Sequence, residues 1–294
     1  MNLMFTQFFG NYLLNKGLVD TKQLSDALAV QKQTRPRLGV LAINAGYMTA
    51  EQVDKVHEEQ QRVDKRIGDI ACDMGFLTHE QVEELLSSQG AAHLQLGQAL
   101  VNSGAMTNAE FADALNSYKK ENSLNDVDFS EGSGEKIDGI IRKFYSFNAD
   151  DTGAYLTEYI ALLFKNIIRF IGDDFTPLAP KTISEIKPEL AAVQKITGAF
   201  NCTTAVSGDE KAYLGFASRY AGEELTELDE MAHASCGEFL NLHNGLFTVN
   251  VSNEMNTELK LMPQDYLEND TLSGNIFEIP LVFPFGTVSF MAVL

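Results

Sequence analysis

The chain has 294 residues, of which 45% are hydrophobic and 21% are charged, so its composition is that of a globular protein and excludes wholesale disorder. This length suits one large domain or two ordinary ones. The net charge of −19 is uneven: residues 1–120 hold 11 basic and 14 acidic residues, a net of −3, whereas the remainder holds 11 and 27, a net of −16. We do not expect the second half to bind nucleic acid nonspecifically, because like charges repel and no counterions would be released.

The start of the chain, "MNLMFTQFFG", has no basic n-region and no small-residue cleavage site, so no signal peptide is expected. The longest apolar run, "YIALLF" followed by "NIIRFIG", is interrupted by Lys165 and Arg169. It is too short to span a bilayer and indicates a core helix. These patterns predict a cytoplasmic protein.

The three cysteines, Cys72, Cys202 and Cys236, are scattered and form no CxxC pair, so we interpret them as reduced thiols. "HEEQQ" at His57 and "HEQVE" at His79 begin like the zinc motif HExxH but lack its second histidine. No metal site is expected.

Residues 1–120 contain an internal repeat of 29 residues. Three series of residues carry it: Gly10, Gly39, Gly68 and Gly97; Gly17, Gly46, Gly75 and Gly104; and Gln31, Gln60 and Gln89, which ends where Tyr118 replaces the glutamine. Four copies of one unit are therefore predicted.

Each unit carries a helix start signal. "TAEQ" at Thr49, "THEQ" at Thr78 and "TNAE" at Thr107 are capping boxes, and "DTKQ" at Asp20 is the version in the first unit. Ahead of each box, stretches such as "RLGVLAINAGYM" predict a shorter helix that a glycine ends. Each unit is predicted to be helix, glycine turn and capped helix, with neighbouring units stacked to bury their apolar faces.

Residues 121–135, "ENSLNDVDFSEGSGE", are polar and predict a flexible linker between domains. After it, a long helix is expected at 154–172. Two strands joined by a turn at "SGDE" are expected in 191–208 and 211–221, and a helix from the pair Thr226 and Asp229 to Gly245. Further strands are expected at 246–253, 277–286 and 287–294. This order predicts an α+β domain over 136–294, with helices packed on an antiparallel sheet.

The predicted helix that contains "CGEFLNLHNG" has two unlike faces. At 100° per residue, one face carries Ala232, Cys236, Phe239 and Leu240 and is expected to contact the sheet. The opposite face carries Glu238 and Asn241 among Met231, Ala234 and Leu242. Two explanations are open: a helix buried on both sides, or a partner-docking surface that carries a chemical pair. Cys236, on the inward face, is interpreted as a core thiol and not as a nucleophile beside His233 or His243.

"GEFLNLHNG", with Glu238 and Asn241 three residues apart, resembles the ExxN signature of the CheX/CheC chemotaxis phosphatases. The order of elements from about 136 to 294 is similar to that family as well. One ExxN is present, as in CheX-like members. Ala234 stands where the family often has Asp or Ser, with Ser235 next to it.

The resemblance implies hydrolysis of the aspartyl phosphate on a response-regulator receiver such as CheY. The receiver would supply Mg2+ and a lysine, so the phosphatase has only to dock and to orient a water in line with the scissile bond. Asn241 would position the water, and Glu238 would pair with the receiver lysine.

The 29-residue units resemble MshEN domains, which are cyclic di-GMP-binding modules. Residues 37–60 keep Arg37, Leu38, Gly39, Gly46 and Gln60 of that motif, and residues 66–89 keep Arg66, Gly68, Gly75 and Gln89, with Ile67 for leucine. Ala42, His57 and Cys72 depart from it. The resemblance implies a nucleotide site in which arginines bind phosphate or guanine and glycines admit the ligand to backbone N–H groups. The alternative is a purely structural or protein-binding array.

We therefore expect a four-repeat helical module followed by a CheX-like receiver phosphatase, with cyclic di-GMP as a regulator. The alternative is a non-enzymatic signalling adaptor, in which the same helix docks partners or forms a homodimer.

Overall fold

A computed structural model describes residues 3–87, 92–121, 145, 151–255 and 257–294. The chain divides into two compact units, Met1–Gly132 and Ser133–Leu294. The predicted linker, 121–135, lies outside the described residues except for Glu121, which is the last residue of a helix.

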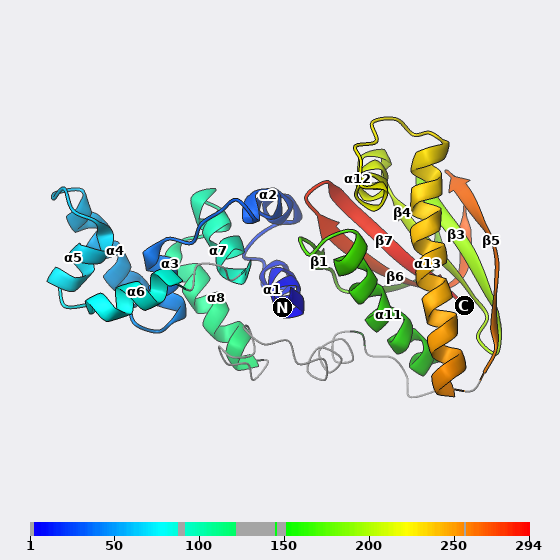
Figure 1. The fold of residues 1–294 in the computed structure, drawn as a ribbon, viewed down its shortest axis with the longest axis horizontal. Coiled ribbons are helices and arrows are strands. Elements are labelled where there is room, and N and C mark those ends of the chain that lie inside the picture. The colour runs from blue at the N-terminus through cyan, green and yellow to red at the C-terminus, as the bar shows by residue number, and fades with distance from the viewer. Residues whose placement is uncertain (1–2, 88–91, 122–144, 146–150, 256) are drawn as a thin grey trace. The chain divides into compact units, whose positions relative to one another are not determined.

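The first unit is helical in its described residues (Figure 1). Its helices are α1 (Leu3–Asn15), α2 (Thr21–Gln31), α3 (Leu38–Asn44), α4 (Ala50–Gln60), α5 (Ile67–Asp73), α6 (His79–Ser87), α7 (Ala92–Asn102) and α8 (Asn108–Glu121).

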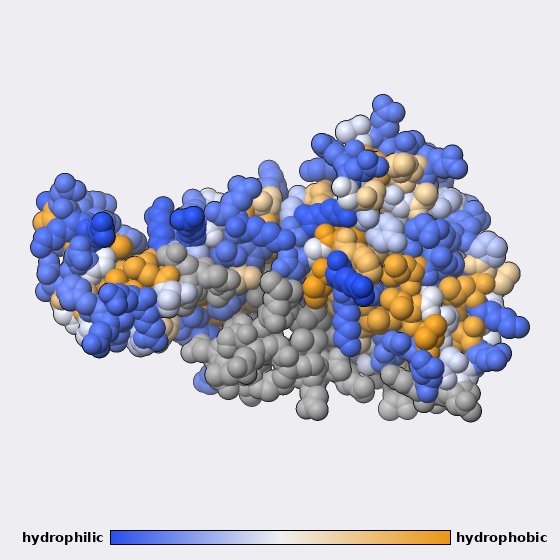
Figure 2. Space-filling model, in the orientation of Figure 1, coloured by the Kyte–Doolittle hydropathy of each residue, from blue (hydrophilic) through white to orange (hydrophobic). Residues whose placement is uncertain are grey.

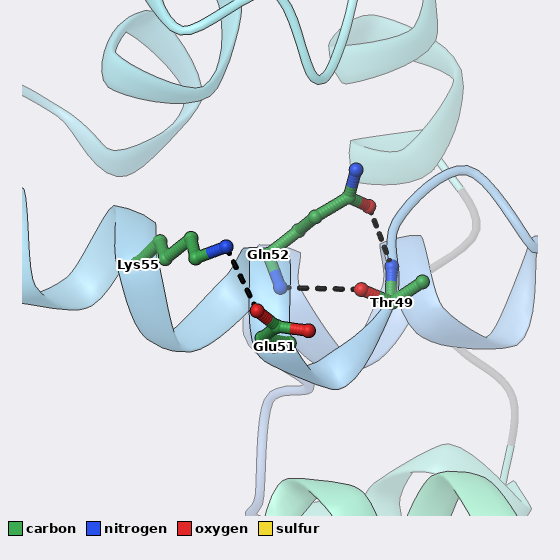
Figure 3. A network of polar contacts seen from close by, with 4 residues as sticks. All are labelled: Thr49, Glu51, Gln52 and Lys55. Carbon is green, nitrogen blue, oxygen red and sulfur yellow. Dashed lines mark hydrogen bonds and ion pairs between the residues drawn. The ribbon is translucent and has the colours of Figure 1, made fainter.

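Local signals fix the ends of these helices as predicted. At Thr49 the hydroxyl oxygen accepts from the backbone N–H of Gln52 at 3.2 Å, and the Gln52 side chain accepts from the backbone N–H of Thr49 at 2.8 Å (Figure 3). Equivalent reciprocal bonds form at Asp20, Thr78 and Thr107. The glycines that follow the first helix of each repeat are left-handed, with φ from 67° to 73° at Gly17, Gly46, Gly75 and Gly104. Only glycine adopts this conformation without steric cost. In the first repeat this helix is not the shorter one, since α1 has 13 residues and α2 has 11.

The other glycine series packs helices closely. A Cβ at Gly39 would lie 2.6 Å from Val53 Cγ1, and one at Gly68 would lie 3.1 Å from Val82 Cγ1. A Cβ at Gly97 would lie 2.1 Å from Phe111 Cε2. In each case the residue that this Cβ would meet lies 14 residues later, on the capped helix of the same 29-residue repeat. Helix packing therefore explains why this glycine recurs every 29 residues: it lets the two helices of one repeat approach each other.

The expected stacking of neighbouring repeats is confirmed in part. The second repeat packs on the third, with α4 against α5 and α3 against α6. The first repeat packs on the fourth instead, with α2 against α7 and α1 against α7 and α8, and the second repeat packs on the fourth as well, with α3 against α7 and α8. Phe9 contacts the rings of Phe111 and Tyr118, at centroid distances of 6.2 and 5.2 Å. Gln31 also donates to the backbone oxygen of Ala92 at 2.7 Å. Aromatic side chains thus join the first repeat to the fourth.

The second unit is α+β, as predicted. Its elements are α11 (Asp151–Phe170), β1 (Thr176–Pro177), β2 (Lys181–Ile186), β3 (Leu190–Gly198), β4 (Cys202–Gly208), α12 (Glu210–Ala221), α13 (Glu230–Met255), β5 (Leu259–Glu268), β6 (Leu272–Phe283) and β7 (Gly286–Val293). The strands form one antiparallel sheet in the order β1-β6-β7-β4-β3-β5, with β2 also paired to β6. Helices α12 and α13 pack on this sheet, and α11 packs on α13 (Figure 1).

Two predicted strands are helical. Residues 211–221, expected to be a strand, belong to α12, because Asp209 accepts from the backbone N–H of Ala212 at 2.8 Å and Gly222 ends the helix at φ 76°. Residues 246–253, also expected to be a strand, continue α13 to Met255 instead of following a helix end at Gly245. Phe247 and Val251 lie four residues apart and are both buried, so packing at helical spacing overrides the β propensity of this stretch.

Candidate functional site

Helix α13 begins as predicted at Asp229, whose carboxylate accepts from the backbone N–H of Ala232 at 3.0 Å. The expected inward face is confirmed, since the side chains of Ala232, Cys236, Phe239 and Leu240 are all fully buried. The sheet and α12 cover this face. The phase of the helix is therefore fixed by its apolar residues, and it leaves Glu238 and Asn241 outside this buried face.

Among the described residues, the face of α13 around Glu238 is open. Glu238 is exposed and Asn241 is half-buried, while Met231, Leu246 and Val249 are 51%, 39% and 56% exposed. Hydrophobic residues gather on the face that Figure 2 shows, over α11 and α13. A helix buried on both sides by the residues that the structure describes is thus excluded. What remains is an exposed, largely apolar surface that carries two polar side chains one turn apart.

Asn241 is held by the sheet beneath it. Its side-chain oxygen Oδ1 accepts a hydrogen bond of 2.9 Å from Nε2 of Gln194, a buried residue of β3. Within the described part of the chain, Nδ2 of Asn241 donates no hydrogen bond. One end of this amide is therefore anchored and the other end is available.

Gln194 is itself fully engaged. Its Nε2 also donates to the backbone oxygen of Met262 on β5 at 3.0 Å, beside an irregularity in the β3–β5 register. Its Oε1 accepts from Asn244 Nδ2 at 2.8 Å. Asn244 also donates to Thr204 Oγ1 at 2.8 Å and accepts from the Tyr159 hydroxyl at 3.1 Å. A chain of satisfied buried polar groups thus runs from α11 through α13 and the sheet to Asn241.

Glu238 has a comparable but more exposed support. Gln264 of β5 donates from Nε2 to Glu238 Oε1 at 3.1 Å. Gln264 and Gln194 are directly paired across the β3–β5 ladder. Gly237 admits this contact, because a Cβ there would lie 2.2 Å from Gln264 Oε1 and 2.7 Å from the hydroxyl of Tyr266. Glu238 forms no ion pair with any residue that the structure describes.

A groove of about 520 Å³ lies beside Glu238, between the end of α12 and the first turns of α13. It is lined by Tyr220, Ala221, Asp229, Glu230, Met231, Ala234, Ser235 and Glu238. Its floor is apolar and its charged groups are acidic. The groove is therefore suited to a protein surface that presents an apolar side chain next to a cation.

Cys236 and His243 are buried and are not placed for catalysis. Burial raises the pKa of the Cys236 thiol to about 12, and its Sγ lies 3.8 Å from the backbone oxygen of Tyr213. Burial lowers the pKa of His243 to about 3, and Nδ1 of this ring lies 3.0 Å from Asn166 Nδ2. Neither group offers a thiolate or an accessible base near neutral pH, which agrees with the interpretation of Cys236 as a core thiol.

The candidate nucleotide residues of the first unit lie at the starts of α3 and α5. Arg37 and Arg66 are the N-cap residues of these helices, and both are exposed, with no side-chain capping bond. Leu38 is buried, and its Cδ2 would lie 3.4 Å from a Cβ at Gly68, so the two helix starts are neighbours.

The space around the two motif glycines is occupied by the protein itself. Val53 fills it at Gly39, and Val82 fills it at Gly68. The cavity between α3 and α5 measures about 10 Å³, which is too small for a nucleotide. Gln60 donates to the backbone oxygen of Lys65 at 3.3 Å, and Gln89 lies outside the described residues.

Three supporting residues, Gln194, Asn244 and Gln264, were not predicted as part of the site. The sequence does carry a signal for the first two. Gln194 interrupts the apolar run "AAVQKI", and Asn244 lies on the buried side of α13, where a polar side chain must find hydrogen-bond partners.

No protein-family model matches the chain, and no curated protein matches it. Solved structures are similar to it in fold over about half of its length. The chemotaxis protein CheX from Desulfovibrio desulfuricans is 16% identical and covers 48% of this chain and 99% of its own, with a TM-score of 0.41. A CheC-like superfamily protein from Shewanella sp. PV-4 is 16% identical and covers 50% and 97%, with a TM-score of 0.43. A CheX–CheY–BeF3–Mg complex from Borrelia burgdorferi is 14% identical and covers 47% and 96%, with a TM-score of 0.42.

Among the residues that the structure describes, no helix is long and apolar enough to cross a membrane. In the same residues, no cluster of three or more His, Cys, Asp and Glu side chains is arranged to hold a metal ion.

Proposed function

We propose that the second unit dephosphorylates the aspartyl phosphate of a response-regulator receiver, with Asn241 positioning the water and Glu238 docking the receiver. The observation that carries the proposal is the half-anchored amide of Asn241, one helical turn from an exposed carboxylate on an apolar face. The ExxN spacing in the sequence supports the same assignment.

The reaction needs little from this chain. The water oxygen forms a bond to phosphorus while the bond between phosphorus and the aspartate oxygen breaks, which leaves an aspartate carboxylate and dihydrogen phosphate. The receiver would supply Mg2+ and a lysine, which neutralise charge on the phosphoryl group. Asn241 contributes orientation, because a fixed amide holds the water in line with the breaking bond. Glu238 contributes a carboxylate that pairs with the lysine and sets the register of docking.

Phosphate release from an acyl-phosphorylated receiver with Mg2+ tests this function. We expect Asn241→Ala to lower the rate at saturating receiver on the order of 100-fold to 1000-fold, as loss of one positioned transition-state hydrogen bond does. Glu238→Gln should chiefly raise the receiver concentration needed for half-maximal rate. Asn253→Ala and Glu268→Gln change the same residue types at other exposed positions, and both should behave as wild type.

Two outcomes would overturn the proposal. If wild type leaves the decay of every receiver of the host unchanged, the domain is not a phosphatase. If the receiver then still binds and Glu238→Gln weakens that binding, the helix is the docking surface of a non-enzymatic adaptor. Turnover that survives Asn241→Ala would place the chemistry elsewhere.

For the first unit we propose cyclic di-GMP as a regulatory ligand, bound by Arg37 and Arg66. What supports this is that two exposed guanidinium groups, without ion pairs in the described residues, stand at neighbouring helix starts. Calorimetric titration of cyclic di-GMP into the full chain tests it. Arg37→Ala and Arg66→Ala should each abolish the heat of binding, while Arg62→Ala, at an exposed surface pair with Glu59, should not. If titration of the wild-type chain gives no heat of binding, the proposal of a cyclic di-GMP ligand is wrong and the repeats are a structural or protein-binding array.

A further inference from the structure

We infer that Gln194 is a positioning residue that determines which end of the Asn241 amide faces the partner, so that the site presents an N–H donor. This inference rests on the function proposed above and names the part of the mechanism that the ExxN motif does not contain. Its basis is two groups of the sheet whose hydrogen-bonding role cannot be reversed.

The orientation of the Gln194 amide follows from a backbone carbonyl. The oxygen of Met262 can only accept, so the group 3.0 Å away must be the Nε2 donor of Gln194. Its Oε1 then faces Asn244, as the 2.8 Å bond from Asn244 Nδ2 requires. A backbone carbonyl therefore fixes an otherwise reversible side chain.

The orientation of Asn244 is fixed in the same way. The hydroxyl of Thr204 donates to the backbone oxygen of Gln194 at 3.0 Å, so its oxygen is left to accept from Asn244 Nδ2. The Oδ1 end of Asn244 then accepts from the hydroxyl of Tyr159. Two carbonyl groups at different places in the sheet thus assign the same orientation to the network.

The orientation of Gln194 determines the orientation of the Asn241 amide. The second N–H of Gln194 Nε2 points to Asn241 and needs an acceptor, so Oδ1 of Asn241 lies inward at 2.9 Å and Nδ2 lies outward. Turning the Asn241 amide over would place two N–H donors against each other and leave both unsatisfied. Gln194 therefore specifies the chemistry of the outward group as well as its position.

An outward N–H donor is the useful end for this reaction. It can occupy one lone pair of the water oxygen and leave the other lone pair directed at phosphorus. An outward carbonyl would instead accept a water proton and would leave the direction of attack less constrained. The predicted cost of losing this control is on the order of 10-fold to 100-fold in rate, since small misplacements of a reacting group have effects of that size.

Gln264 provides a matched comparison within the same sheet. It is paired with Gln194 across β3 and β5, but it holds Glu238 and not Asn241. Substitution of either glutamine by Met keeps the length of the side chain and removes the amide. Gln194→Met should lower kcat for phosphate release with little change in KM, whereas Gln264→Met should raise KM with little change in kcat.

Tyr159→Phe controls for damage to the buried network. It removes the bond to Asn244 Oδ1 while the bond from Gln194 to Asn241 stays intact, so we expect lower stability but an unchanged kcat. Equal kcat values for wild type and Gln194→Met would overturn the inference while the proposed function stands. A wild type without any turnover would instead remove the function on which the inference rests.

A second readout does not depend on activity or on folding of a variant. In hydrogen-exchange NMR of the wild-type chain, the side-chain NH2 of Gln194 should be strongly protected, and that of Asn241 should exchange rapidly through its outward end. Protection of the Asn241 NH2 together with rapid exchange at Gln194 would mean the reverse orientation and would refute the assignment of the donor.

Discussion

Gly245 lies one helical turn after Asn241 on α13, and a Cβ at Gly245 would meet no described atom within 4 Å apart from its own stretch of helix. Glycine in the interior of a helix destabilises it relative to alanine by roughly 0.5–1 kcal/mol. No described residue of the second unit requires this glycine, in contrast to Gly237, whose side of the helix is filled by Gln264 and Tyr266. The open space beside Gly245 is where a partner docked over Asn241 would come closest to the helix.

Gly245→Ala is therefore expected to have opposite effects on folding and on docking. The free energy of unfolding should rise by roughly 0.5–1 kcal/mol, as for a helix glycine whose replacement meets no clash. The added methyl group should at the same time raise the receiver concentration needed for half-maximal phosphate release. Urea unfolding and the phosphate-release assay measure the two effects on one sample. A variant that is more stable and equally active would show that the receiver does not approach this turn.

The ion pair between Arg219 and Asp174 joins α12 to the segment before β1. The guanidinium of Arg219 donates to both carboxylate oxygens, with 2.8 Å between Nη2 and Oδ2, and it lies 4.9 Å from the ring centroid of Phe285. The side chains are 28% and 9% exposed, so the pair is only partly screened by water.

Asp174→Asn removes the charge but keeps the shape, and we expect it to destabilise the second unit by about 2 kcal/mol, less than the loss typical of a fully buried pair. Arg219→Lys should be nearly as harmful, because an ammonium cannot form the two parallel bonds. Thermal unfolding followed by circular dichroism measures both. Lys55→Met, which breaks the exposed Glu51–Lys55 pair, should leave the melting temperature unchanged. A similar melting temperature for Asp174→Asn and wild type would contradict the structural importance of this pair.

How much of the first unit could be predicted from the sequence depends on how far apart in the chain the contacting residues are. The capping boxes and the left-handed glycines of the first unit depend on contacts within three or four residues, so the pattern at Thr49 or Gly46 is enough to predict them. The packing of the first repeat on the fourth depends on the contact of Phe9 with Phe111 and Tyr118, which are about a hundred residues away in sequence. The 29-residue period alone predicts contacts between neighbouring repeats, and it gives no signal for a contact between the first repeat and the fourth.

The same limit applies to the second unit and to its site. The inward face of α13 was predicted correctly because helical spacing defines it. The strand assigned to 246–253 was wrong because its Val and Thr residues favour β structure, while burial of Phe247 and Val251 decides for helix. Gln194 and Gln264 reach Asn241 and Glu238 only through the pairing of β3 with β5. Because β5 was not recognised as a strand, the support of the site could not be predicted.

The glycines that pack the first unit predict a graded series of mutants. A Cβ would lie 2.1 Å from the ring of Phe111 at Gly97, 2.6 Å from Val53 at Gly39 and 3.1 Å from Val82 at Gly68. Overpacking of this kind costs about 1–3 kcal/mol, and the gain in helix propensity on replacing glycine by alanine offsets part of it. We expect Gly97→Ala to destabilise most, Gly39→Ala less and Gly68→Ala least.

Chemical denaturation of the three variants measures this order. Phe111 is buried and packed against Phe9, so it cannot move aside without disturbing the contact between the first and fourth repeats. A flat series, in which all three variants unfold alike, would show that the glycines are not required for helix packing. Their period would then need the ligand-based explanation instead.

His243 makes the stability of the second unit depend on pH. Its ring is fully buried against Tyr159, at a centroid distance of 4.4 Å, and Asn166 Nδ2 lies 3.0 Å from Nδ1. Burial lowers the pKa of His243 to about 3, well below the value of about 6.5 for an exposed histidine. The unfolded chain therefore binds the proton more readily than the folded chain does. This contribution to stability is complete above about pH 6.5 and is lost as the pH falls toward about 3.

Between pH 7 and pH 5 we expect this histidine to remove about 2 kcal/mol from the free energy of unfolding, since each pKa unit corresponds to about 1.4 kcal/mol. His243→Phe lacks the titrating group, so the same change of pH should affect it much less, whatever its stability at pH 7. His79→Asn, which changes an exposed histidine of the first unit, should keep the wild-type dependence for the second unit. Urea unfolding at pH 7, 6 and 5 measures the slopes, and parallel slopes for wild type and His243→Phe would mean that burial does not lower the pKa of His243.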